Sequence, residues 1–493
     1  MVHARREDLQ IKVPALLHLS RLGYGYLDRP SLRSRDRKTN ILPDALRNAA
    51  ERINGIRMTP EMLRCLTDDL RSQLDREDLG RQFYCTIRNG WNGIRLIDFA
   101  HPEKNLFQSA AELACGSGAG SFRPDITLFV NGLPLAVIEV KTRERPGGLQ
   151  AEYDRMLTRI RSPEGRRYFQ CVQIWAFSDD CEDDPGRFLP TEGSFYATVM
   201  ADDFPVYAVR ERHSGIYSRL ISRNPEEEQR ILADNGIPEE PHTRFFQQSR
   251  SSRKPTHRML TTLFHPERFL FLLRYGIRYV RETDPAGKEY MTRRMLTTGQ
   301  LSVLEGLIGK AKRGYRNWTV LSCGAAGEEA ANASMVSLLR DLEPEARLYW
   351  VSADETSLHR DHAALRSCGL QCGPRKNAAD GQLILFSAEE DPIRLLTAAG
   401  EHGFSGRRFF ILPQFIPKYG QKTVFPAELR KADPNAILVT RITNRASDSQ
   451  PAFVLSAHTG NALYYFTVTR RQVPAESRKS AHDREAAAKE GQK

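Results

Sequence analysis

Two acidic residues and a lysine stand at a spacing suited to the hydrolysis of a phosphodiester bond. Asp125 precedes one β-rich run, and Glu139 and Lys141 end the next, separated only by Val140. Because side chains alternate along a strand, Glu139 and Lys141 project from one face while Val140 turns toward the other. Two charges on one face at the end of an apolar strand are costly unless they have partners or a metal ion. The pattern therefore indicates a site rather than a plain core strand.

The connection between the two runs decides whether Asp125 can join this site. The connection contains Asn-Gly, a strong signal for a β-hairpin. A three-residue loop over 131–133 would place Asp125 opposite Glu139, whereas a two-residue loop would place it opposite Ile138, on the other face. We therefore expect a three-residue loop or an equivalent β-bulge.

These residues predict a divalent-metal site. The carboxylates of Asp125 and Glu139, with the backbone carbonyl of Val140, are oxygen ligands of the kind that Mg²⁺ or Mn²⁺ prefers. Such a metal lowers the pKa of a bound water and neutralises charge on a phosphate. Lys141 would orient the water or stabilise developing negative charge. The same residues also fit a β-hairpin with charged ends at a sheet edge, and their spacing alone leaves that alternative open.

The composition favours a nucleic-acid partner. The 493 residues are too many for one compact core, so two or three domains are expected. Lys and Arg number 72 against 61 Asp and Glu, a formal charge of +11 that attracts polyanions. The eight cysteines form no CxxC pair, which predicts free thiols. We find no signal peptide and no apolar run that could span a membrane, so we expect a cytoplasmic protein.

Periodicity along the chain predicts a mixed α/β fold. Helices are expected over Lys12 to Leu22, within Ala45 to Leu79, and over Leu149 to Arg161. Strands are expected at FYCTI, GIRLIDF, ITLFV, LPLAVIEV and VQIWAFSD. A helix is predicted at HPERFLFLLRYG, with proline near its start and glycine at its end. The last third alternates WTVLSC, RLYWVSA, GQLILFS, RRFFILP and AILVTR with helices, which predicts a parallel, doubly wound sheet.

This order of elements divides the chain into four parts. Residues 1–205 form the predicted nuclease domain, and 206–310 a linker and helical connector, with the polar stretch Gln247 to Arg258 as the linker itself. Residues 311–473 form the doubly wound domain. The charged tail, 474–493, is predicted to be disordered.

At these residues the sequence resembles the restriction (R) subunit of type I restriction enzymes. The similar segments are Arg123 to Lys141, LGYGYL, LIDFAHPEKN, the SDD after the next strand, and LFHPERFLFLLRYGIRYV. The resemblance extends over nearly the whole chain but only over the first half of the family's length. The resemblance implies a PD-(D/E)xK restriction-endonuclease-like domain in which Asp125, Glu139 and Lys141 cleave DNA.

Two details of that family's nuclease do not match. The family usually has an acidic residue on its first helix; here Glu7 or Asp8 could supply it, but Lys12 occupies the expected spacing. The family also has QxxxY on the helix after the lysine, where this chain has Asp154 and Thr158. The positioning of the DNA strand is therefore expected to differ.

The resemblance also implies a P-loop motor, and its phosphate-binding residues are degenerate here. A P-loop needs glycines, a lysine and a Ser or Thr for the nucleotide phosphates and Mg²⁺. In WTVLSCGAAGEEAANAS, Gly324 and Gly327 remain, but Glu328 and Glu329 stand where the lysine and the hydroxyl belong. Each exchange turns attraction to phosphate into repulsion, on the order of 1–4 kcal/mol at effective surface dielectrics.

The residues expected to bind the motor's metal ion are also replaced. Pro413 and Gln414 stand where the family has Asp and Glu, so ATP is not expected as a cofactor. Together with the resemblance, the candidate site implies a Mg²⁺-dependent DNA endonuclease of restriction and anti-phage defence, delivered to DNA by a methyltransferase/specificity complex or a separate helicase. The alternative is a non-catalytic scaffold or decoy that occupies the R subunit's binding site. Glu328, Pro413 and Gln414 disfavour a third function, an ATP-dependent translocase.

Overall fold

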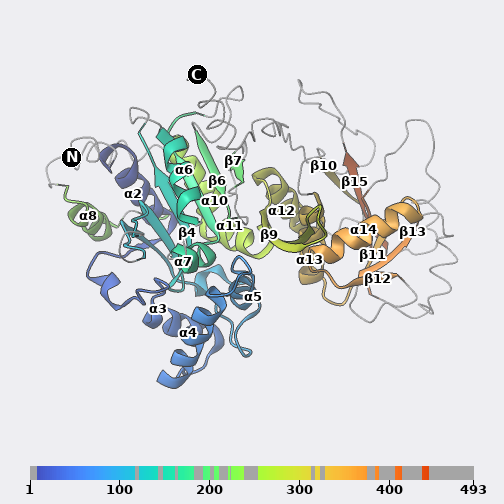
Figure 1. The fold of residues 1–493 in the computed structure, drawn as a ribbon, viewed down its shortest axis with the longest axis horizontal. Coiled ribbons are helices and arrows are strands. Elements are labelled where there is room, and N and C mark those ends of the chain that lie inside the picture. The colour runs from blue at the N-terminus through green and yellow to red at the C-terminus, as the bar shows by residue number, and fades with distance from the viewer. Residues whose placement is uncertain are drawn as a thin grey trace, which may run out of the picture.

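A computed structural model of the chain describes most of its first three quarters and parts of the remainder (Figure 1). The residues described are 8–116, 121–142, 148–160, 165–182, 193–199, 205–209, 220–222, 224–237, 254–312, 317–322, 328–374, 383–387, 406–413 and 436–443. The predicted tail and most of the predicted linker lie outside these residues.

The N-terminal half is built on a seven-stranded sheet whose strands follow one another in chain order. Its strands are β1 (Gly25–Tyr26), β2 (Phe107–Ala111), β3 (Ile126–Val130), β4 (Leu133–Val140), β5 (Ile174–Ser178), β6 (Ser194–Ala197) and β7 (Val206–Ala208). The pairs β1–β2 and β4–β5 are parallel, and the other neighbours are antiparallel. The sheet therefore continues three residues past the expected domain boundary at residue 205.

The central strand β4 is buried along its whole length, which explains why its sequence is almost entirely apolar. Ile138 and Val140 pack into the hydrophobic cluster on one face of the sheet. Val137 packs into the cluster on the other face, together with Leu149 and Met156 of α6 (Gly148–Ile160). Since side chains alternate along the strand, the residue after Ile138 turns toward α6.

Further helices cover this sheet and extend beyond it (Figure 1). They are α2 (Val13–Leu22), α3 (Pro43–Asn54), α4 (Pro60–Leu74), α5 (Arg81–Asn89) and α7 (Arg166–Cys171). Local signals set their ends: α3 begins at a proline and ends before Gly55 in the left-handed region, and the Thr59 hydroxyl caps α4 by accepting the backbone N–H of Met62.

Two predicted strands are absent from the structure. FYCTI lies inside α5, where Phe83, Tyr84, Thr86 and Ile87 are buried at helical spacing. GIRLIDF is irregular and forms only an isolated bridge between Trp91 and Ile94. The β-branched and aromatic residues of these short runs indicated strands. In the folded chain the first run instead forms an amphipathic helix, and the second packs as irregular structure.

A helical connector with a β-hairpin links the two halves. It consists of α10 (Pro255–Phe264), α11 (Pro266–Phe271), a π-helical turn (Leu272–Gly276), β8 (Ile277–Thr283), β9 (Glu289–Met295) and α12 (Thr298–Lys312). The preceding helix, α8 (Pro225–Asp234), packs instead against α2 and β1 of the first half. The predicted helix HPERFLFLLRYG is confirmed, although its last turn is π-helical. The Tyr84 hydroxyl of α5 donates to the carbonyls of Leu273 and Ile277, which fastens the connector to the first half.

The C-terminal half contains a six-stranded sheet in which every pair of neighbours is parallel. In spatial order the strands are β10 (Asn317–Ser322), β15 (Ala436–Thr443), β14 (Arg408–Leu412), β11 (Arg347–Ser352), β13 (Leu383–Ser387) and β12 (Cys372–Pro374). The helices α13 (Glu328–Leu342) and α14 (Glu355–Ser367) separate them along the chain. The predicted parallel sheet is confirmed; its P-loop-like character stays a prediction.

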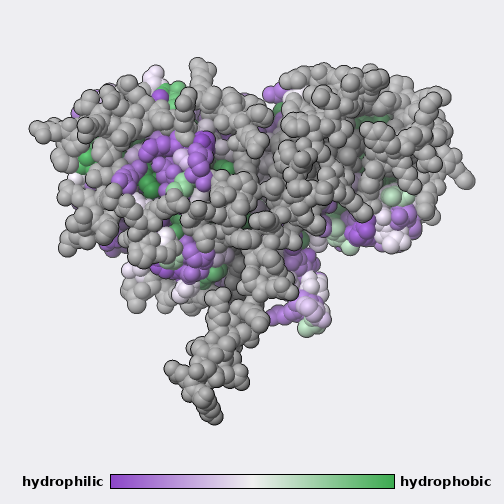
Figure 2. All heavy atoms as spheres, turned by 90° about the horizontal axis from the view of Figure 1, so that it is seen from above, coloured by the Kyte–Doolittle hydropathy of each residue, from purple (hydrophilic) through white to green (hydrophobic). Residues whose placement is uncertain are grey.

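The described residues expose few large hydrophobic side chains. From the direction of Figure 2, hydrophobic residues appear only as small spots among hydrophilic ones. The large hydrophobic residues exposed in the described part of the chain are Ile56, Ile221 and Tyr290. None of the described helices combines the length and the apolar character that a membrane span requires.

Candidate active site

A β-bulge between β3 and β4 sets the strand register at the predicted site. The strands are joined by the two-residue turn Asn131-Gly132, so Val130 pairs with Leu133. Beyond Leu128 the pairing shifts by one residue, and Ile126 pairs with Ile138. This is the bulge that we expected in place of a three-residue loop. It brings Asp125, directly before Ile126, into line with Glu139, directly after Ile138.

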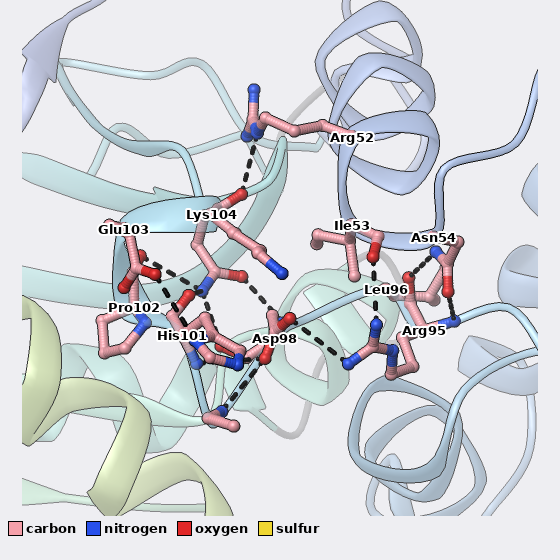
Figure 3. A network of polar contacts seen from close by, with 12 residues as sticks. Arg52, Ile53, Asn54, Arg95, Leu96, Asp98, His101, Pro102, Glu103 and Lys104 are labelled. Atoms are coloured by element: carbon pink, nitrogen blue, oxygen red, sulfur yellow. Dashed lines mark hydrogen bonds and ion pairs between the residues drawn. The ribbon is translucent and has the colours of Figure 1, made fainter.

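The turn is held in place by the loop that contains LIDFAHPEKN. The amide of Asn131 donates to the side chain of Asn105 at 2.9 Å, and Asn105 in turn accepts the backbone N–H of Asp98 at 2.9 Å. Figure 3 shows the buried Asp98 carboxylate accepting hydrogen bonds from Arg95 and from the backbone N–H of His101. The segment LIDFAHPEKN, which is part of the family resemblance, thus has a structural role, because it anchors the hairpin.

Asp125 and Lys141 are in direct contact. Asp125 Oδ2 accepts the backbone N–H of Val140 at 2.8 Å and a hydrogen bond from Lys141 Nζ at 3.0 Å. Lys141 Nζ also donates to the carbonyl oxygen of Val140 at 2.7 Å. The lysine side chain is 4% exposed and that of Asp125 13%. The ammonium therefore contacts two of the three oxygens predicted to bind a metal.

Glu139 lies beside this pair as a buried carboxyl group with unsatisfied hydrogen-bonding capacity. Its residue is 3% exposed, and Oε1 has no hydrogen-bond partner among the described residues. Burial is the main cause that raises the pKa of Glu139 well above its usual range; the neighbouring Asp125 raises it further and Lys141 opposes the rise. A buried acid without sufficient compensation is the kind of group that a cation stabilises.

The donor set suits a hard divalent cation. Within the described ranges no three His, Cys, Asp or Glu side chains gather around a common point. The candidate set instead combines two carboxylates with the carbonyl of Val140. Mg²⁺ is commonly held by one or two carboxylates while it keeps several waters, so the residues present fit it.

Helix α6 adds an acidic residue that the sequence did not single out. The buried residues of α6 are Leu149, Glu152 and Met156, which share one face of the helix. Glu152 Oε2 lies 3.8 Å from Lys141 Nζ. An acid placed between two apolar residues at helical spacing was the available signal. The resemblance to QxxxY directed attention to other positions.

Those other positions, Asp154 and Thr158, are exposed to solvent. Asp154 accepts a hydrogen bond from the neighbouring Gln150 at 2.9 Å, and the Thr158 hydroxyl donates to a backbone carbonyl of its own helix. They were expected at the place of QxxxY, but neither faces the site, because they lie on the opposite side of α6 from Glu152.

At the spacing expected for an acid on the first helix, the structure has a lysine in an ion pair. Glu7 and the side chain of Asp8 lie outside the described residues. Lys12 is buried, and its Nζ contacts Glu112 Oε1 at 2.7 Å. The backbone N–H of Glu112 donates to the carbonyl of Asp125 at 3.2 Å. A lysine–glutamate pair thus adjoins the strand end that carries Asp125.

Comparison with known proteins finds a family match for the N-terminal part of the chain. Residues 5–182 match the family described as the type I restriction enzyme R protein N terminus. The match confirms the resemblance noted from the sequence for this part of the chain. All of the candidate site residues lie within it.

Two relatives carry related names. The chain is 33% identical over 132 residues to the HindI endonuclease subunit of a type I restriction enzyme from Haemophilus influenzae, which covers 22% of this chain and 12% of the relative. It is 46% identical over 50 residues to an endonuclease subunit assigned to the type I restriction enzyme MjaVIIIP of Methanocaldococcus jannaschii, covering 10% and 5%. The matches thus span small fractions of both relatives.

The C-terminal half lies beyond the residues of the family match. Gly324, Gly327 and Gln414 fall outside the described residues, while Glu328 and Glu329 form the first turn of α13, directly after β10 in the described part of the chain. Acidic residues are favourable at a helix N-terminus. There they occupy the position at which the helix would otherwise bind an anion. Pro413 follows the end of β14.

Proposed function

We propose that this chain is a Mg²⁺-dependent DNA endonuclease whose active site consists of Asp125, Glu139, the Val140 carbonyl and Lys141. The observation that carries the proposal is the convergence of these groups: Lys141 Nζ lies 3.0 Å from Asp125, and the bulge aligns Asp125 with the buried Glu139. The match of residues 5–182 to the R protein N terminus supports the same reaction class.

The chemistry divides between the cation and the protein. A bound Mg²⁺ would lower the pKa of a water molecule and neutralise charge on the scissile phosphate. Asp125 and Glu139 provide anionic oxygens for it, and Val140 provides a neutral one. Lys141 provides a positive charge that can hold a water or a phosphate oxygen in a largely buried site, where electrostatic interactions are stronger than in water.

Basic residues on α6 support DNA as the substrate. Arg155 and Arg159 lie on the same helix as Glu152, with side chains 51% and 31% exposed. Partly exposed guanidinium groups beside a cleavage site can contact the phosphate backbone. The formal charge of +11 provides a wider attraction. We infer a role in restriction and anti-phage defence, in line with the names of both relatives.

We propose further that the C-terminal half is a P-loop-like lobe that does not hydrolyse ATP. The support is the pair Glu328 and Glu329 in the first turn of α13, where a nucleotide phosphate would meet negative charge. A nuclease of this kind needs another component to bring it to DNA. The proposed partner is a methyltransferase/specificity complex or a separate helicase.

The test uses supercoiled plasmid and the purified full chain. Cleavage is measured with Mg²⁺, Mn²⁺ or EDTA, each with and without ATP. We expect nicking or linearisation that requires the metal, is unaffected by ATP, and disappears in Lys141→Ala. Lys288→Ala, an exposed lysine on the β8–β9 hairpin, is the matched control and should cleave normally. Absence of cleavage with either metal, also with the proposed partner added, would favour the scaffold or decoy alternative.

A further inference from the structure

The ammonium of Lys141 occupies the place where a divalent cation would find its ligands. Lys141 Nζ is 3.0 Å from Asp125 Oδ2 and 2.7 Å from the carbonyl oxygen of Val140. These are two of the three oxygens proposed to hold Mg²⁺. Two cations at hydrogen-bond distance from the same oxygens would repel each other strongly, because charges are poorly screened in a buried site. If Mg²⁺ binds there, the ammonium has to move.

A second acceptor for the ammonium stands next to this position. Glu152 Oε2 is 3.8 Å from Lys141 Nζ, within the range of an ion pair but beyond a hydrogen bond. The flexible four-carbon stem of lysine allows a shift of this size by rotation about its bonds. Glu152 is therefore the carboxylate to which the ammonium can turn without leaving the protein interior.

Glu152 is itself held firmly. Its residue is 3% exposed, and it forms ion pairs with Arg155 at 2.5 Å and Arg159 at 3.4 Å, both on α6. Arg159 also lies over the ring of Phe122, with its guanidinium carbon 4.9 Å from the ring centre. A buried carboxylate that two arginines fix is an acceptor of defined position, which is what an ordered shift of Lys141 requires.

We propose that Lys141 has two positions and that Glu152 is the positioning residue for the second. In the inner position the ammonium bonds Asp125 and Val140 and takes the place of the metal ion. In the outer position it pairs with Glu152 and leaves those oxygens to the divalent cation. This inference rests on the proposed function, since it assumes that the site binds a divalent cation.

The proposal predicts competition between the lysine and the metal. The apparent affinity for the metal equals the intrinsic affinity reduced by the fraction of molecules whose lysine is in the outer position. Loss of Glu152 lowers that fraction and weakens metal binding. Loss of the ammonium removes the competitor and tightens it. The effect of Glu152 should therefore depend on Lys141, and a double-mutant cycle measures that dependence.

The experiment is calorimetric titration of Mn²⁺ into the full chain without DNA, so that no cleavage is involved. The proteins are wild type, Glu152→Gln, Lys141→Met and the double variant. We expect Glu152→Gln to weaken binding about five- to tenfold in the wild type but less than about twofold in the Lys141→Met background. Lys141→Met alone should tighten binding about threefold or more. Asp154→Asn, an exposed acid on the same helix, is the control for loss of a negative charge and should change little.

The possible results separate the two proposals. If the wild type binds no Mn²⁺, the proposed function fails and this inference with it. If the wild type binds but Glu152→Gln weakens binding equally in both backgrounds, Glu152 acts only through its charge and the two-position inference is wrong. Should Glu152→Gln fail to fold by circular dichroism, Lys141→Met decides alone: unchanged or weaker binding in that variant would mean that the lysine does not compete.

Discussion

Gly132 in the turn between β3 and β4 provides a quantitative test of how the hairpin is positioned. Its φ of 79° lies in the left-handed region, as a tight two-residue hairpin turn requires. Its carbonyl accepts the backbone N–H of Leu42, just before α3, at 2.9 Å. A Cβ on Gly132 would lie 2.6 Å from the carbonyl oxygen of Leu42 and 3.0 Å from the backbone nitrogen of Leu46. Those two atoms form the first hydrogen bond of α3, so an added methyl group would press on the start of that helix.

Gly132→Ala should therefore destabilise the protein through two separate effects. The left-handed conformation costs an alanine about 1 kcal/mol or slightly more. The overlap with backbone atoms adds about 1–3 kcal/mol, because the start of α3 has to shift and the hydrogen bond from Leu42 is weakened. We expect a total of about 3 kcal/mol, a large share of the stability of an ordinary domain.

Gly55 at the end of α3 is the matched control. It also has a left-handed φ, 65°, but a Cβ there would meet no atom within 4 Å. Gly55→Ala should cost only the conformational part, about 1 kcal/mol. Urea unfolding of both variants, followed by far-UV circular dichroism, measures the difference. Equal unfolding midpoints would show that the turn does not pack against α3 as described, and the account of the hairpin's anchoring would be wrong.

Three further perturbations test other parts of the structure. Asp125→Asn should reduce Mg²⁺-dependent plasmid cleavage by about a hundredfold or more while circular dichroism stays unchanged; retained cleavage would exclude this residue from the site. Burial lowers the pKa of His18 well below 6.5, and the neighbouring His257 lowers it further. As the pH falls, His18 therefore takes up a proton in the unfolded chain before it does so in the folded protein. The free energy of unfolding consequently decreases below pH 6.5. Between pH 7.5 and 5.5 the free energy of unfolding of the wild type, measured by urea titration, should fall by about 1.4 kcal/mol, and His18→Gln should not show this loss. As a control, the exposed His101→Gln should behave like the wild type. Arg268→Met should lower the free energy of unfolding by about 3 kcal/mol, since it removes the buried guanidinium that pairs with the mostly buried Glu305; combining it with Glu305→Leu should recover part of the loss, and no recovery would contradict the pairing.

The strands around the candidate site could be predicted from the sequence because local signals agreed there. The Asn-Gly turn and the apolar runs on both sides indicated the hairpin. The requirement that Asp125 and Glu139 share a face indicated an irregularity in the pairing, and the structure has a bulge between Leu128 and Phe129. The parallel C-terminal sheet was predictable for a similar reason, since its buried strands read as short apolar runs between helices.

Contacts between distant parts of the chain could not be predicted in the same way. The pair Lys12–Glu112 joins residues 100 positions apart, and no local pattern indicates such a partner. Glu152 was missed because the family motif suggested Asp154 and Thr158, and only the packing of α6 shows which face meets the sheet. The run FYCTI was assigned to a strand since five residues are too few to separate the two periodicities.

The bulge that aligns Asp125 with Glu139 is also supported from the far side of β4. In the bulged segment, the carbonyl of Leu135 accepts the backbone N–H of Gln173, just before β5, at 2.8 Å. The Gln173 side chain in turn accepts a hydrogen bond from Arg293 of the connector hairpin at 3.3 Å. Arg293 is fully buried and also donates to the carbonyl of Phe169 at 3.3 Å. Because a buried guanidinium needs all of these acceptors in place, the connector and β5 constrain the irregular segment of β4 together. The register that brings the carboxylates into line is therefore a property of the packed molecule and not of the hairpin sequence alone.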